Sequence, residues 1–130
     1  MLEQINPETV CRIIGGIREF QAKEEVVLPE VADSSSDDWA LQVLADHGDD
    51  LTYDETRGVI DDLEPDQQIA LVALMWVGRG DFLETEWEDA QAAAEENWNP
   101  RTAEYLLATP LADDYIEGGL ALLGYSCEEQ

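Results

Sequence analysis

Residues 69–77 read IALVALMWV, the longest apolar run of the 130-residue chain. A buried strand would also be apolar throughout, but Ala, Leu and Met favour a helix. The residues before the run, Pro65 to Gln68, form a helix start, because proline is preset for a first turn and the following aspartate complements the helix dipole. A helix that is apolar on all sides is buried on all sides. The run therefore predicts a central buried helix over about residues 66–78, ended by Gly78 and Gly80.

Helical periodicity extends outward from this run. Asn6 and Pro7 predict an N-cap with proline at the first helical position, and apolar residues then recur at i, i+3, i+4, i+7 and i+10. Thr52 with Glu55 fits a capping box at a second helix start. Further starts are indicated at Thr85 with Glu88, Asn99 with Pro100, and Thr109 with Pro110. No segment alternates with period two, so the chain is predicted to be all-α, a compact bundle of six or seven short helices around the central one.

The chain is interpreted as a single domain over residues 1–130, the usual size for one core. An N-terminal helix over 1–25 precedes a polar, acidic and serine-rich linker over 26–38, which is expected to be flexible. The helical core domain follows over 39–125 and a short tail over 126–130. Whether the first helix packs on the core stays open.

The compartment is predicted from the N-terminus and from the two cysteines. The chain starts with neither a basic region nor an apolar signal core, and no apolar run is long enough to cross a bilayer, which predicts a cytoplasmic protein. Cys11 is expected to be a small buried hydrophobic residue, and Cys127 lies in the polar tail. A disulfide between them is conceivable but disfavoured in a reducing compartment.

The composition is strongly acidic, with 31 Asp and Glu against 6 Lys and Arg and a formal net charge of −25. Such a surface repels nucleic-acid phosphates and anionic lipids, so no direct binding to nucleic acid or membrane is expected. Residues 33–66 hold 12 of the acids and one base, nearly half of the excess in about a quarter of the chain. We therefore predict an acidic face that binds a basic protein surface. Its expected residues are Asp46, Asp49, Asp50, Asp54, Glu55, Asp61 and Asp62.

The predicted function is a non-enzymatic protein-interaction module. A narrower hypothesis is a nucleic-acid mimic that occupies the basic groove of a DNA- or RNA-binding protein. The alternative is that the acidity adapts the surface to a saline cytoplasm, because every segment is acidic and Lys23 is the only lysine. The domain would then be a small enzyme or ligand-binding protein whose site the sequence does not reveal, and its oligomeric state is open.

No catalytic residue, metal ligand or cofactor is predicted. Residues 80–87 resemble the second half of an EF-hand calcium loop, but the first half places Met75, Val77 and Arg79 where calcium needs oxygen ligands. His47 is the only histidine, so no histidine pair exists for a metal. Pairs of acids on one helix arise by chance in so acidic a chain and therefore indicate no general acid–base site.

One segment resembles a known family. Residues 71–82 read LVALMWVGRGDF, with Glu86-Trp87 and the TAEYLL stretch of residues 102–107 behind them. This pattern resembles a small bacterial family of helical domains of unknown function marked by an LVAL motif, over roughly Tyr53 to Tyr125. The resemblance implies a bacterial origin and a helical domain, and it carries no reaction, ligand or partner. The signature turn consists of Gly78, Arg79, Gly80, Asp81 and Trp87.

Overall fold

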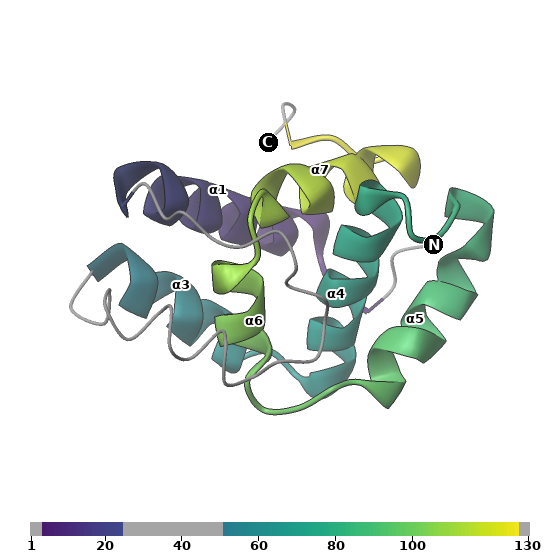
Figure 1. Ribbon diagram of the computed structural model, residues 1–130, viewed down its shortest axis with the longest axis horizontal. Coiled ribbons are helices and arrows are strands. Elements are labelled where there is room, and N and C mark those ends of the chain that lie inside the picture. Colours follow the sequence, from purple (N-terminus) through teal and green to yellow (C-terminus); the bar gives the residue numbers. More distant parts are fainter. Residues whose placement is uncertain (1–3, 25–50, 128–130) are drawn as a thin grey trace.

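A computed structural model describes residues 4–24 and 51–127 of the chain (Figure 1). This described part is helical and contains no strand, which confirms the predicted all-α bundle. Its elements are α1 (Pro7–Glu24), α3 (Leu51–Asp61), α4 (Pro65–Arg79), the short 3-10 turn η1 (Glu84–Glu86), α5 (Trp87–Glu96), α6 (Thr102–Ala108) and α7 (Ala112–Leu122). The expected linker over 26–38 and the first residues of the expected core domain, 39–50, lie outside the described residues.

The central helix is α4, as the apolar run predicts. Every residue from Ala70 to Val77 is buried, and α4 packs against α7 on one side and α5 on another (Figure 1). Its C-terminal end has the predicted glycine geometry at Gly80, whose φ is 98°. The Gly80 N–H donates to the carbonyl of Val77 at 3.1 Å and the Asp81 N–H donates to that of Trp76 at 2.9 Å, a Schellman motif that satisfies two carbonyls of the last turn.

Gly78 does not end the helix, so that part of the prediction is wrong. It lies inside α4, where α7 crosses so closely that a Cβ on Gly78 would overlap the carbonyl oxygen of Tyr115. Gly119 of α7 lies equally close to α4, since a Cβ on Gly119 would overlap the carbonyl oxygen of Leu74. Two helices whose backbones meet at this distance need glycine on both sides.

α1 packs on the core, which settles the question that the sequence left open. Its residues Val10, Ile13, Ile14, Ile17 and Phe20 are all buried, as their helical spacing predicts. α1 contacts α3, α6 and α7, and it begins as expected, because the Asn6 side chain accepts a hydrogen bond from the Glu8 N–H at 2.7 Å.

A disulfide joins Cys11 of α1 to Cys127 at the end of the described chain, with the two Cα atoms 5.6 Å apart. The expectation that a disulfide between them is disfavoured is therefore wrong. That expectation rested on a reducing compartment, and the sequence could not show that the fold brings the two ends of the chain together. Cys127 is not in a detached tail, because this bond fixes it to the first helix.

Several helix starts differ from the predicted capping boxes. α3 begins at Leu51, so Thr52 lies inside the helix and cannot precede it as a cap. At the start of η1 the capping carboxylate is Glu86, which accepts from the Leu83 N–H at 2.7 Å. Thr109 donates its hydroxyl back to the carbonyl of Tyr105 at 2.6 Å, so it closes α6 and does not cap α7. The sequence patterns located these helices but misplaced their first turns by one or two residues.

α7 starts from Leu111, which has a left-handed backbone, φ 61° and ψ 21°. This conformation costs a leucine roughly 1–2 kcal/mol, because its Cβ crowds the backbone. Leu111 is 53% exposed, so its side chain contributes little packing in return. We expect Leu111→Gly to raise the free energy of unfolding by about 1 kcal/mol in a urea titration. Leu122→Gly, at the half-exposed last residue of the same helix, should lower it by up to about 1 kcal/mol, and equal effects of the two changes would contradict the prediction.

Candidate functional site

The predicted acidic face is found in part on α3. Asp54, Glu55, Asp61 and Asp62 are all exposed, whereas Asp46, Asp49 and Asp50 lie outside the described residues. Asp54 and Asp61 are seven residues apart in α3 and so lie on the same side of the helix, about 10 Å apart, and Asp62 directly follows the end of α3, seven residues after Glu55. We call these four residues the α3 acidic face. Exposed Glu64 and Asp66 extend it toward the start of α4.

The one arginine of α3 is bound to acids of the protein itself. Arg57 lies 3.3 Å from Glu104 of α6, whose side chain is only 8% exposed, and 3.4 Å from Asp61. The negative charge of Glu104 is the largest influence on the pKa of Arg57, which is raised. Arg57 thus compensates a buried carboxylate and links α3 to α6. Its charge offsets Asp61 alone among the residues of the α3 acidic face.

The signature turn has a structural role at the end of α4. Arg79 donates to Asp81 through Nε at 2.9 Å and through Nη2 at 2.6 Å. Together with the glycines at the α7 crossing and at the helix end, this pair fixes where the chain leaves α4. Trp87, the last residue of the turn, is buried in the core at the start of α5.

Aromatic residues continue this structure from α4 to α6. Trp76 stacks on Phe82 with ring centroids 6.3 Å apart, and its Nε1–H donates to the Tyr105 hydroxyl at 3.2 Å. Burial raises the pKa of the Tyr105 hydroxyl. Trp98 is 39% exposed, and its Nε1–H donates to the Gln68 side chain at 2.7 Å.

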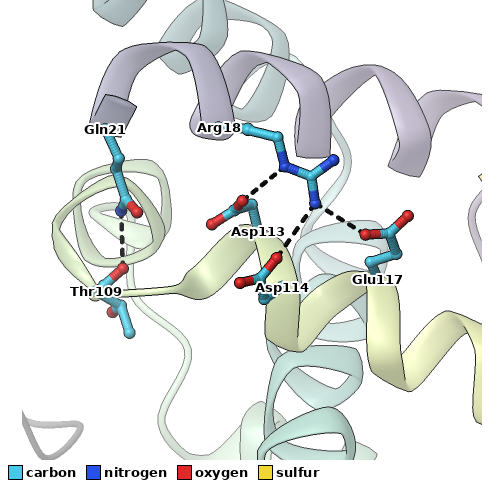
Figure 2. A network of polar contacts seen from close by, with 6 residues as sticks. All are labelled: Arg18, Gln21, Thr109, Asp113, Asp114 and Glu117. Carbon is cyan, nitrogen blue, oxygen red and sulfur yellow. Dashed lines mark hydrogen bonds and ion pairs between the residues drawn. The ribbon is translucent and has the colours of Figure 1, made fainter. Parts of the chain in front are cut away.

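A second ionic cluster, which the sequence did not suggest, joins α1 to α7 (Figure 2). Arg18 contacts Asp113 at 2.9 Å, Asp114 at 3.3 Å and Glu117 at 2.8 Å. Hydrogen bonds to Glu117 and then Asp113 raise the pKa of Arg18 above its usual range. One helical turn further along α1, Gln21 donates to the carbonyls of Leu107 and Thr109, at 3.0 Å and 2.8 Å. The three acids recur at i, i+1 and i+4 in α7, but only the fold shows that an arginine 95 residues earlier faces them.

Three arginines of the described residues are paired within the protein. Arg18, Arg57 and Arg79 each contact at least one carboxylate of the chain. A further set of acids surrounds an open hollow of about 600 Å³ at the start of α5: Glu84, Glu86, Glu88 and Asp89. Within residues 4–24 and 51–127, no three His, Cys, Asp or Glu side chains form a group that could hold a metal ion.

A groove of about 410 Å³ lies between α1 and α3. Its lining consists of Arg12, Ile13, Gly16, Glu19, Glu55, Thr56 and Val59. Glu55 belongs both to this groove and to the α3 acidic face, so the two features form one continuous surface.

The sequence of the chain matches one known family. The family model for a protein of unknown function, DUF3775, matches residues 53–125. The chain belongs to this family. No curated protein and no solved structure matches it. The predicted resemblance to a domain family of unknown function is thereby confirmed, while the bacterial origin and the LVAL motif stay predictions.

The DUF3775 match covers α3 through α7 and ends at Tyr125. The signature turn and the α3 acidic face lie within the matched residues, whereas α1 and Cys127 lie outside them. The groove therefore has one wall from the DUF3775 domain and one from α1. Within the part of the chain that the structure describes, no helix has both the length and the apolar character that crossing a membrane requires.

Proposed function

We propose that this DUF3775 protein is a non-enzymatic interaction module that binds a basic protein surface through the α3 acidic face. The observation that carries the proposal is the arrangement of charge on α3. Its acids are exposed, while its arginine is engaged with Glu104 and Asp61. A partner that approaches α3 therefore meets exposed carboxylates, and the arginine of α3, Arg57, is already paired within the protein.

The size of the effect follows from the number of contacts. An exposed ion pair contributes roughly 0.2–1 kcal/mol, so pairs formed by Asp54, Glu55 and Asp62 with Lys or Arg of a partner contribute about 0.6–3 kcal/mol together. A charged surface of this kind increases the rate of association and selects against acidic partners, and its contribution falls as salt screens it. The narrower form of the proposal is nucleic-acid mimicry, in which the carboxylates of the α3 acidic face occupy a basic groove that otherwise binds phosphates.

We expect neutralisation of the α3 acidic face to weaken binding of a basic partner by about tenfold or more. The variant is Asp54→Asn/Glu55→Gln/Asp61→Asn/Asp62→Asn, and the measurement is quantitative capture of basic proteins from a lysate at low and at high salt. Binding by the unmodified protein should be strong at low salt and lost at high salt.

A matched control carries the same change in net charge on another helix. Glu88→Gln/Asp89→Asn/Glu95→Gln/Glu96→Gln alters four exposed acids of α5. Capture unchanged by the α3 variant, or reduced equally by both variants, would contradict a specific α3 surface and support a general role of the acids in solvation. Thermal unfolding of both variants verifies that each is folded.

A further inference from the structure

The groove between α1 and α3 results from a change of side-chain size along both helices. Gly16 faces Thr56, and a Cβ on Gly16 would overlap the threonine side chain, so the helices touch at small residues. One turn to either side, α1 carries the longer Arg12 and Glu19 at the rim. Small residues in the middle and long ones at the edge give this groove the form of a trough, and we call it the trough below. Its volume of about 410 Å³ is within the range of about 300–1,000 Å³ for pockets that hold ligands.

The direction of the helices gives the trough two different ends. α1 and α3 run antiparallel (Figure 1), since Phe20 near the end of α1 packs against Tyr53 near the start of α3, with the rings tilted and their centroids 5.6 Å apart. Glu19 and Glu55 therefore share the end near this aromatic pair, and Arg12 lies toward the opposite end, beside Val59. The trough combines an acidic end, a middle of small residues, and a second end that carries the apolar Val59 and one guanidinium.

We infer that the trough seats an aliphatic side chain from an amphipathic basic helix of the partner protein. The inference rests on the proposed function and adds where the partner docks and what its docking segment is. Val59 supplies the partly exposed apolar contact above the buried Ile13, and a Lys or Arg one turn from the aliphatic residue on the partner reaches Glu55. Charge complementarity favours a basic peptide over an anionic ligand, because Glu55 continues into the α3 acidic face.

The test uses two synthetic peptides with the same charge, followed by fluorescence anisotropy with the full chain. The first is a helical peptide of about 18 residues with Leu along one face and Lys along the other, and the second replaces each Leu with Ser. We expect the Leu peptide to bind about tenfold or more tightly, because burial of a leucine side chain in the trough adds to the ionic contacts. Equal affinity of the two peptides would overturn the docking site.

Variants of the protein then test whether the preference for the Leu peptide arises at the trough. Val59→Gln removes an apolar lining residue without changing charge and should abolish most of the preference for Leu, with the affinity for the Ser peptide unchanged. Leu122→Gln is the matched control on α7, also a partly exposed aliphatic residue, and should retain the full preference. Glu55→Gln should weaken binding of both peptides.

The outcomes separate this inference from the proposed function. If the preference survives Val59→Gln while neutralisation of the α3 acidic face abolishes binding, the trough is not the docking site and the acidic interaction stands. If neither peptide binds the unmodified protein, both proposals fail. If Val59→Gln does not fold, amide chemical shifts of the unmodified protein test the docking site instead. The Leu peptide should then shift the amides of Gly16, Thr56 and Val59 more strongly than the Ser peptide does, and equal shifts would overturn the docking site.

Discussion

Gly119→Ala is expected to lower the free energy of unfolding by about 3 kcal/mol or more. The added Cβ would overlap the carbonyl oxygen of Leu74 on the central helix, and a backbone atom cannot rotate away as the end of a side chain can. Overpacking of a core costs about 1–3 kcal/mol when side chains can adjust, so a contact that forces α4 and α7 apart should reach or exceed the upper end. Gly78→Ala meets the carbonyl oxygen of Tyr115 and should act similarly.

The neighbouring glycine is the control. A Cβ on Gly118 would meet Gly78 no closer than 3.8 Å, an ordinary contact. Gly118→Ala should therefore raise the free energy of unfolding by about 0.5–1 kcal/mol, the usual preference of a helix interior for alanine. Urea titrations of the three single variants measure the difference. Equal responses of Gly118→Ala and Gly119→Ala would show that α4 and α7 are not in backbone contact.

Gly78 and Gly80 show why the sequence predicted the central helix α4 correctly but not the residue at which it ends. Nine consecutive apolar residues behind a proline start are sufficient to predict a buried helix, because burial is a property of the segment itself. Gly78 and Gly80 both follow that run, and each fits the preference for glycine after a helix. Only the position of α7, about forty residues later, distinguishes a glycine required by a helix crossing from one required by a left-handed turn.

The candidate site was predictable to a similar degree. Asp54, Glu55, Asp61 and Asp62 could be named because local charge density predicts exposure. The engagement of Arg57 with Glu104 could not, since it depends on α6 lying beside α3. The trough also depends on tertiary contact, because Gly16 and Thr56 are ordinary helix residues until the two helices pair.

Removal of the Cys11–Cys127 disulfide should lower the free energy of unfolding by about 4–5 kcal/mol, the estimate from chain entropy for a closed loop of this length. The two cysteines are 116 residues apart, so the bond restricts almost the whole unfolded chain. Since small domains are stable by only about 5–15 kcal/mol, this is a large part of the total. The change is Cys11→Ser/Cys127→Ser, measured by urea titration beside the oxidised protein.

The loss should reflect the unfolded state and leave the native contacts of α1 in place. Arg18 still contacts Asp113, Asp114 and Glu117, and the buried apolar face of α1 still packs on the core. The double serine variant should therefore keep the helical circular dichroism of the oxidised protein while unfolding at lower urea. Reduced unmodified protein is the control and should match the variant, since both lack the cross-link. Identical urea midpoints with and without reductant would contradict the bond, and loss of helical signal before unfolding would show that α1 depends on the disulfide for docking.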